Sequence, residues 1–425
     1  MQDAESEHRL NPPRHRFFSI LLAAVLVCLL DLTGLHNACA QSVDVEQSLT
    51  EDRAVQRPLL SIQPWRWTRT KLIRTTKLIE DLTRLSLGTS YTTIYQIAPA
   101  APTPHHTWVG SLDIYGAWHL VDSATLGDGT LGFVYRNRNV WAPLTGNQLA
   151  ADAGLPWGIN NSGSAAYNRF NQVWWQQSLL GEKLVIQAGK IDQTTHFNTN
   201  RVASSDGRDF LMQSLVYSQT IAFPANGLGL NLRYWPDPRL YVDAGLADAN
   251  GNPDRKPNDS IDSFVQGHYF EAFEIGFVPD MKTVSPALGE GHYRLMGWHT
   301  AEASDHGAGS GVALSVDQEL PNQMVPFMRV GYCPAGAGRT STEVDWGVVS
   351  VAPLQRSSDR LGFGATWAKP TAPSTHDQFA FELFYRAQVV DGFQITPDAE
   401  FIINPALNPN SNFQAVFGIR VRAYL

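Results

Sequence analysis

The sequence is poor in cysteine and in charge, and it lacks the common local signatures of catalysis. It has 3 cysteines among 425 residues, and only 17% of its residues are charged. There is no CxxC pair, GxSxG, HExxH or P-loop motif, so redox, hydrolase and nucleotide-binding chemistry have no local support. His105 and His106 are adjacent and would point to opposite faces of a strand. We therefore expect no enzyme activity, no cofactor and no metal site.

Long apolar runs are also scarce, since Phe17–Leu30 is the only one. Three arginines precede it and Ala38-Cys39-Ala40 follows it, which predicts a secretory signal peptide over residues 1–40, cut after Ala40. An uncleaved N-terminal anchor is the alternative, although the run is short for a membrane span. The exported chain would keep Cys333 alone, which excludes an intramolecular disulfide.

Aromatic residues, in contrast, are abundant. They make up 11% of the chain, with 12 tryptophans, while the mean hydropathy is slightly negative. An amphipathic barrel gives this combination, because half of its strand positions face lipid and half face water. A large soluble β-sandwich would also fit. The formal net charge of −8 argues against nucleic-acid binding.

The region 41–84 is predicted to be an N-terminal leader followed by a short amphipathic helix. Residues Gln41–Arg57 are polar and lack periodicity, which indicates a flexible leader. Apolar residues then recur at helical spacing over Lys71–Arg84, with basic residues between them. This helix would either pack against the barrel or form a plug, at the periplasmic end or inserted into the lumen.

From Leu85 onward the apolar residues recur at every second position, which is the period of a half-buried strand. We expect about 16 strands and an all-β fold, an antiparallel transmembrane β-barrel over 85–425, because single-chain bacterial barrels have even strand numbers. The clearest runs are Trp108–Leu120, Leu131–Arg138, Leu228–Tyr234, Phe273–Phe277, Leu361–Trp367, Phe379–Arg386 and Phe413–Leu425.

The last of these runs carries the strongest signal. Apolar residues from Phe413 to Ala423 occupy one face, and Arg420 and Arg422 lie on the other. This is the pattern of a closing barrel strand whose apolar face contacts lipid and whose arginines point into the lumen. Leu425 continues the apolar face.

The spacers between strands alternate in length. Pro236–Arg239 and Asp391-Gly392 are tight turns, whereas Asn139–Asn168, Asp192–Phe210 and Asn250–His268 are long. Outer-membrane barrels have short periplasmic turns and long extracellular loops, which can fold into the lumen.

A sugar-selective pore needs aromatic platforms and charges of both signs that exchange hydrogen bonds without trapping an ion. Arg136 and Arg138 share the polar face of one predicted strand, Trp141 follows them, and Asp113 lies on the neighbouring strand. We expect these four to line the constriction, and Trp174 and Trp175 to form an aromatic platform or a girdle. Further charged lining residues are expected at Glu382 and Arg386.

Several motifs occur in an order that resembles the carbohydrate-selective porin family of Gram-negative outer membranes. They are Asn171–Gln177, Gly189–Asp192, Gly227–Pro236, Gly291–Thr300, Glu382–Gln388 and Phe401–Pro405. The resemblance spans about Leu85–Leu425 and implies a 16-stranded barrel that passes glucose and other small sugars by facilitated diffusion, without a cofactor. The family usually ends in Phe, whereas this chain ends in Leu425.

We therefore expect an outer-membrane porin for small sugars. Its partners would be sugars, outer-membrane lipid and the barrel-assembly machinery, and it would be a monomer or a trimer. The alternatives are a general or other-solute channel, a barrel enzyme, and a secreted glycan-binding β-sandwich.

Overall fold

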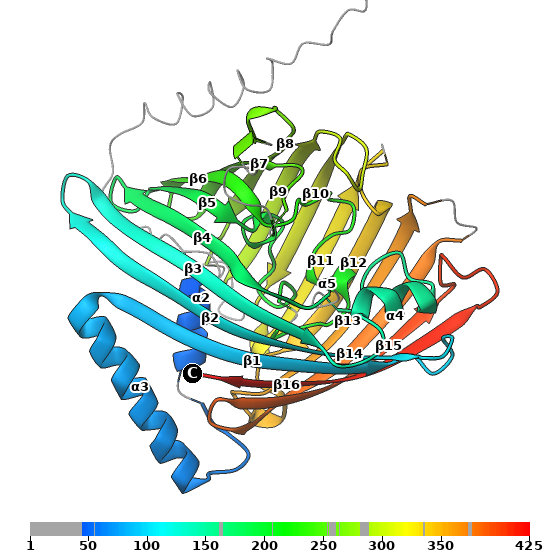
Figure 1. Ribbon diagram of the computed structural model, residues 1–425, viewed down its shortest axis with the longest axis horizontal. Coiled ribbons are helices and arrows are strands. Elements are labelled where there is room, and N and C mark those ends of the chain that lie inside the picture. Colours follow the sequence, from blue (N-terminus) through cyan, green and yellow to red (C-terminus); the bar gives the residue numbers. More distant parts are fainter. Residues whose placement is uncertain are drawn as a thin grey trace, which may run out of the picture. The chain divides into compact units, whose positions relative to one another are not determined.

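The chain forms a closed antiparallel β-barrel of 16 strands in a computed structural model (Figure 1). The structure describes residues 45–54, 56–160, 165–205, 207–252, 254, 261–262, 264–280, 289–334, 336–372 and 376–425. The expected signal peptide lies outside them. The strands are β1 Leu85–Ile97, β2 His106–Ser123, β3 Gly127–Val140, β4 Tyr167–Leu179, β5 Leu184–Ile191, β6 Gly227–Asp237, β7 Leu240–Asp248, β8 Tyr269–Phe277, β9 Gly291–Thr300, β10 Gly309–Gln318, β11 Met324–Tyr332, β12 Thr340–Ser350, β13 Arg360–Pro370, β14 Gln378–Val390, β15 Phe393–Ile403 and β16 Phe413–Tyr424.

Each strand pairs with its sequence neighbours, and β16 closes the barrel on β1. Ser90 lies opposite Tyr424, and Ile97 lies opposite Phe417. Closure leaves no sheet edge, so the strands satisfy one another's backbone groups around the whole wall, as a hydrocarbon environment requires. The predictions of a 16-stranded barrel and of a closing strand at the C-terminus are confirmed.

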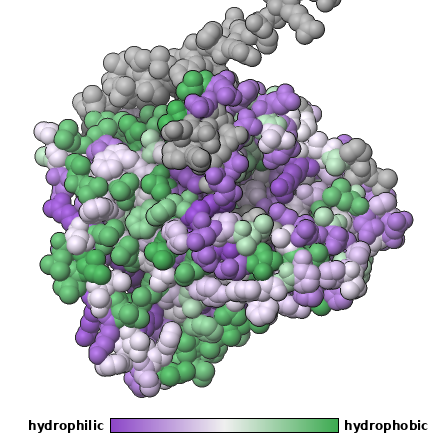
Figure 2. Space-filling view, in the orientation of Figure 1, coloured by the Kyte–Doolittle hydropathy of each residue, from purple (hydrophilic) through white to green (hydrophobic). Residues whose placement is uncertain are grey.

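The two faces of the wall differ in polarity. Apolar side chains are exposed on the outside (Figure 2), as the alternation of β-strands requires. Those exposed by more than a third include Tyr91, Trp108, Ile114, Trp118, Leu230, Leu295, Trp346, Phe379, Leu383, Phe401 and Phe417. Charged and amide side chains are buried on the inside, among them Gln96, Asn231, Asp243, Glu274, Asp317, Arg329, Glu343, Glu382, Glu400 and Arg420.

The connections at the two ends of the barrel differ in length. Turns at 124–126, 180–183, 238–239 and 391–392 lie at the end where β1 starts and β16 finishes; we call this the short-turn end. The connections 141–166, 192–226 and 249–268 lie at the other end. They include helices α4 Gly146–Ala153 and α5 Gln213–Val216 and the 3-10 turn η1 Gln193–Thr195, while η3 Pro321–Gln323 and η4 Pro353–Gln355 lie in short-turn connections.

Among the described residues, two helices precede the barrel where one was expected. Helix α3 covers Gln63–Thr83, beginning eight residues before the predicted Lys71 because Pro64 fits the first turn of a helix. It has no buried residue, so the prediction of a lumen-inserted plug is wrong for this helix. Helix α2 covers Val45–Arg53, where a flexible leader was expected. No helix among the described residues is both long and apolar enough to cross a membrane.

Candidate pore lumen

The connection 192–226 folds into the barrel and lies along its inner wall. Carboxylates of the wall accept hydrogen bonds from its backbone. Glu382 of β14 accepts from the amides of Leu211 and Met212 at 2.6 and 2.8 Å. Glu274 of β8 accepts from Asn198 at 2.8 Å. Because these bonds are charge-assisted, they fix the loop more firmly than neutral ones would.

Arginines of the wall bind the carbonyl groups of the same loop. Arg329 of β11 is fully buried and donates to the carbonyl oxygens of Asn198, Ala203 and Leu215 at 2.5 to 3.2 Å. Arg420 of β16 donates to Asp209 at 2.9 Å. These arginines and carboxylates, which we call the wall clamps, satisfy loop backbone that would otherwise be buried without partners.

Apolar side chains of the loop pack against the far wall. Phe210 meets Phe327 and Phe384 with ring centroids 5.5 and 4.9 Å apart. Leu215 joins the same buried cluster, together with Leu149 of α4. The loop and α4 therefore close the part of the lumen that is bounded by β11–β16.

Helix α2 occupies another part of the lumen. Val45 and Leu49 are buried in a cluster with Tyr115, Val134 and Trp174 on the inner face of β2–β4. The side chain of Asp52 pairs with Arg422 of β16 through bonds of 2.8 and 2.6 Å. It also accepts a bond of 2.5 Å from the hydroxyl of Tyr115. The helix is thus attached to the wall by apolar packing and by a buried ion pair.

Asp52 also joins α2 to the loop. Arg208 of the loop lies 3.5 Å from Asp52 and 3.3 Å from Glu51. Burial by itself would raise the pKa of Asp52, but Arg422 and Arg208 outweigh burial and lower it. Asp52 is therefore charged at neutral pH and connects the helix, the loop and the wall.

The charged pair of Asp113 and Arg136 remains partly accessible on the inner face. The two residues are directly opposite on β2 and β3. Arg136 donates Nε to Oδ1 at 2.6 Å and Nη2 to Oδ2 at 2.9 Å, and the two side chains are 28% and 19% exposed. On the same face Arg138 is buried, with its guanidinium 4.9 Å from the ring of Tyr167.

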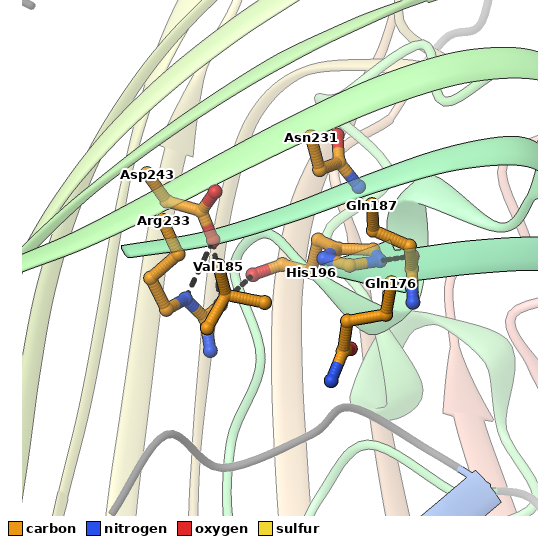
Figure 3. A pocket seen from close by; sticks show the side chains of 7 residues that line it. All are labelled: Gln176, Val185, Gln187, His196, Asn231, Arg233 and Asp243. Atoms are coloured by element: carbon orange, nitrogen blue, oxygen red, sulfur yellow. Dashed lines mark hydrogen bonds and ion pairs between the residues drawn. The ribbon is translucent and has the colours of Figure 1, made fainter. Parts of the chain in front are cut away.

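A small polar pocket lies further round the wall, between β4–β7 and the loop (Figure 3). Arg233 pairs with Asp243 at 2.6 Å and donates to the carbonyl of His196 at 3.3 Å. Asn231 is 3% exposed, and neither polar atom of its side chain has a hydrogen-bond partner among the described residues. A buried amide of this kind suits a water molecule or a hydroxyl group.

His196 bridges the loop and this pocket. Its Nε2 lies 2.7 Å from Oε1 of Gln187, which assigns the hydrogen to Nε2 in the neutral ring. Burial, with Arg233 nearby, lowers the pKa of His196 to about 3. The imidazole is therefore neutral at physiological pH and adds no charge to the lumen.

Two of the expected lining residues lie on the outer face instead. Trp141 packs edge-on against the exposed Trp108, with centroids 5.3 Å apart, because it lies three positions after Arg138 and the faces of a strand alternate. Trp175 is paired in register with Leu131 and Ala188, which point outward. The prediction that these two line the pore is wrong, and the girdle alternative fits the place of Trp175.

The other expected residues point inward but differ in accessibility. Asp113 and Arg136 are accessible, whereas Arg138 is buried on Tyr167. Trp174 is 2% exposed because α2 covers it. Glu382 is a wall clamp, and Arg386 donates to the carbonyl of Arg208 at 2.9 Å, so both hold the loop.

Sequence reasoning missed α2 and most of the wall clamps. Val45, Leu49 and Asp52 follow the i, i+4, i+7 spacing of one helical face, which could have revealed α2. The clamps carry no local signal because each acts on a distant backbone segment. Within the described residues, no group of three or more His, Cys, Asp or Glu side chains could hold a metal ion.

Curated relatives of the chain are porins. The porin AaxA of Chlamydia felis is 24% identical over 327 residues, which cover 74% of this chain and 70% of that protein. The porin AaxA of Chlamydia pneumoniae is 25% identical over 324 residues, with 72% and 70% covered.

Solved structures show the same fold. The structure of Pseudomonas putida OprB at high pH matches with a TM-score of 0.68 at 14% identity, covering 87% of this chain and 99% of that one. The low-pH structure of the same protein gives a TM-score of 0.51 at 14% identity, with 88% and 100% covered.

A family match agrees with these similarities and extends over most of the barrel. Residues 145–310 and 300–424 match the carbohydrate-selective porin, OprB family. This is well over half of the chain, and it includes the loop 192–226 and the closing strand β16. The chain therefore belongs to the carbohydrate-selective porin, OprB family, and is an outer-membrane porin.

Proposed function

We propose that the protein passes small sugars of the glucose type through the outer membrane by facilitated diffusion. The observation that carries this proposal is the partly accessible pair of Asp113 and Arg136 on the inner face of β2–β3. Residues 1–40 would direct export and then be removed, as their sequence predicts.

The charges of the lumen are largely compensated within the wall. Asp113 pairs with Arg136, Asp243 with Arg233 and Asp52 with Arg422, all at 2.6 Å. Such pairs present donors and acceptors at fixed places without a large net field that would hold an ion. A neutral, hydroxylated solute can exchange hydrogen bonds with them as it passes, and the unpartnered amide of Asn231 adds a further donor and acceptor.

A channel for another solute is the second candidate. The curated relatives are named as porins without a substrate in their names. Arg136 and Arg169 are directly opposite on β3 and β4, so two guanidinium groups, with their partners Asp113 and Asp254, are concentrated on one part of the inner face. A channel of that kind would favour anions over sugars of equal size.

Liposome swelling with the purified protein distinguishes the two candidates. We expect glucose to enter faster than a zwitterionic amino acid or an organic anion of similar size. Equal rates would indicate a general pore, and faster entry of the anion would favour the second candidate. Either result would contradict the sugar proposal.

The role of the accessible pair can be tested in the same assay. Arg136→Ala combined with Arg138→Ala should change the ratio of glucose to anion entry several-fold, because Asp113 loses its partner and the lumen loses two cations. The matched control combines Arg57→Ala and Arg239→Ala, two arginines exposed at the short-turn end. An unchanged ratio in the first variant would remove this cluster from the selective part of the pore.

A further inference from the structure

Helix α3 has three faces with different surroundings. Successive residues of an α-helix are roughly 100° apart around its axis. Arg69, Ile73, Thr76 and Glu80 share one face and are the less exposed positions. A second face is mainly cationic and polar. The third is apolar and is formed by Trp65, Trp67, Leu72, Leu78, Ile79 and Leu82.

The apolar face is uncovered. Trp67, Leu78 and Leu82 are 62%, 57% and 75% exposed, and Trp65 and Leu72 are 41% and 47% exposed. A contiguous apolar stripe of this length on a protein surface marks an interaction site. The rest of the described chain therefore leaves most of this stripe uncovered.

The contacts of α3 show how the helix runs. Its first turn contacts the β14–β15 turn, where Trp65 donates to the carbonyl of Asp391 at 2.6 Å. Arg69 then lies 5.8 Å from the ring of Tyr424, at the end of β16. The carbonyl of Thr83 accepts from Trp118 of β2 at 2.9 Å. The helix therefore crosses β15, β16, β1 and β2 in turn, along the short-turn rim and parallel to the membrane plane.

The level of the helix is set by an aromatic residue. Trp118 is 40% exposed on the outer face of β2, opposite Leu85 at the start of β1, and tryptophans at this level of a barrel wall lie at the boundary between lipid and water. Since Trp118 bonds directly to the end of α3, the helix lies at this boundary. Its apolar stripe continues the lipid-facing surface of the barrel.

The charge of α3 indicates the kind of surface that it meets. The helix carries Arg66, Arg69, Lys71, Arg74 and Lys77 against Glu80 and Asp81, and Arg53 neutralises Glu80 at 2.7 Å. Lys71 lies within the apolar face with its Nζ 3.5 Å from the ring of Trp67. A lysine ammonium above a tryptophan ring is a cation–π contact, and it places a positive charge within the apolar face.

We propose that α3 lies in the interface of the membrane leaflet at the short-turn end and binds anionic phospholipid. Its apolar stripe enters the boundary between headgroups and acyl chains, and its basic residues contact phosphate groups. An amphipathic helix with basic residues beside Trp and Leu binds membranes through both of these contributions. Helix α3 would thereby contact phospholipid along about a quarter of the rim of the barrel.

Site-specific fluorescence in vesicles tests this proposal. The full chain is made cysteine-free by Cys28→Ala, Cys39→Ala and Cys333→Ala, and single cysteines are introduced by Leu78→Cys or Trp67→Cys. Thr70→Cys on the polar face is the matched control. Each variant carries an environment-sensitive dye and is reconstituted with nitroxide-labelled lipid in phosphatidylethanolamine containing 30% phosphatidylglycerol, on the order of a strongly anionic leaflet, or in phosphatidylcholine.

We expect the nitroxide to quench the dyes at 78 and 67 several-fold more than the dye at 70. Reversing the charges of Lys71, Arg74 and Lys77 to Glu should reduce this quenching in phosphatidylglycerol and change it little in phosphatidylcholine. Heat-modifiable electrophoretic mobility verifies that each barrel has folded, and Leu82→Cys replaces any variant that fails.

Two results would overturn the proposal. In the first, aqueous iodide quenches all three dyes equally in anionic vesicles, so that the stripe faces water. In the second, protection at 78 depends on protein concentration and is accompanied by crosslinks between copies, so that a second copy of the chain covers the stripe. Liposome swelling is unaffected by either result, so the test is independent of the proposed sugar transport.

Discussion

Helices α2 and α3 are neighbours in sequence, but α2 lies inside the lumen and α3 lies along the short-turn rim. The apolar residues Val45 and Leu49 of α2 are buried in the lumen, and its Asp52 forms a buried ion pair. Helix α3 buries none of its residues. Both helices combine an apolar face with charged residues. In α2 this combination lies inside the pore, and in α3 it lies at the outer rim.

The difference follows from what each helix finds around it. The buried carboxylate of α2, Asp52, meets Arg422 and Arg208 in a space closed to water, where an ion pair needs full hydrogen bonding. The basic residues of α3 remain exposed and are not tied to the wall by comparable pairs, except Arg66 and Arg69 near the rim. The buried ion pair of Asp52 holds α2 in the lumen, whereas the exposed charges of α3 suit a position at the surface of the barrel.

Removal of the buried carboxylate of Asp52 should have the largest effect, because it should release α2 and leave α3 in place. Asp52→Ala leaves Arg422 buried without its partner, which costs about 3–5 kcal/mol of the free energy that holds α2 in the lumen. We expect higher single-channel conductance in planar bilayers because the helix leaves its place. Asp81→Ala, an exposed aspartate of α3, is the control and should leave conductance unchanged. Equal conductance of both variants would show that α2 does not obstruct the pore.

Truncation of one leucine in each helix should give a smaller difference in stability between the α2 and the α3 variant. Leu49→Ala removes a side chain that is 5% exposed and should cost about 2–3 kcal/mol. Leu78→Ala alters a side chain that is 57% exposed and should change stability in detergent by less than about 0.5 kcal/mol. Hydrogen exchange of the α2 amides measures the first effect, and thermal unfolding measures both. Equal losses would mean that the two helices are buried alike.

Acidification should release α2 from its ion pair with Arg422. The pKa of Asp52 is lowered below its ordinary value of 3.8, so its contribution is complete above pH 3.8 and is lost as the pH falls through the folded-state value. We expect conductance to be constant above that pH and to rise below it. Asp52→Asn should remove this dependence. A rise that persists in Asp52→Asn would point to another group.

Arg53 of α2 pairs with Glu80 of α3, and a second link between the two helices should contribute least. Arg69 of α3 donates to the carbonyl of Asp52 at 2.8 Å. Arg69→Ala removes one part-buried hydrogen bond and should weaken α2 docking by about 1 kcal/mol. Hydrogen exchange should report slightly faster opening of α2, with no change in the barrel. An effect as large as that of Asp52→Ala would mean that α3 holds α2 in the pore.

Much of the wall could be predicted from alternation, and the exceptions have physical causes. Strand β16 alternates cleanly because one face meets lipid and the other meets polar groups. Strand β4 was placed within a spacer and a motif, because the adjacent tryptophans 174 and 175 are both apolar while pointing to opposite faces. A register shift between Val134 and Tyr135 opposite it further disturbs the pattern.

The site was less predictable than the wall. Periodicity correctly placed Asp113, Arg136 and Arg138 on one inward face, because that depends only on neighbouring strands. It could not show that Glu382 and Arg386 serve the loop, since their partners near Leu211 and Arg208 are more than 150 residues away. Trp141 was misplaced although alternation decides its face, because it lies an odd number of positions from Arg136 and Arg138 and so points outward.

The contacts of Asp52 also bear on the junction where the two ends of the sheet meet. Strands β1 and β16 are the wall neighbours furthest apart in sequence, and their pairing closes the longest chain loop of the fold. Asp52 bonds to Arg422 on one side of this junction and to Tyr115 of β2 on the other. Helix α2 therefore links the strands on the two sides of the β1–β16 closure from inside the barrel. The pairing of β1 with β16 and the docking of α2 are therefore thermodynamically coupled. A barrel that loses α2 also loses stabilisation of the strand pair whose formation costs the most chain entropy.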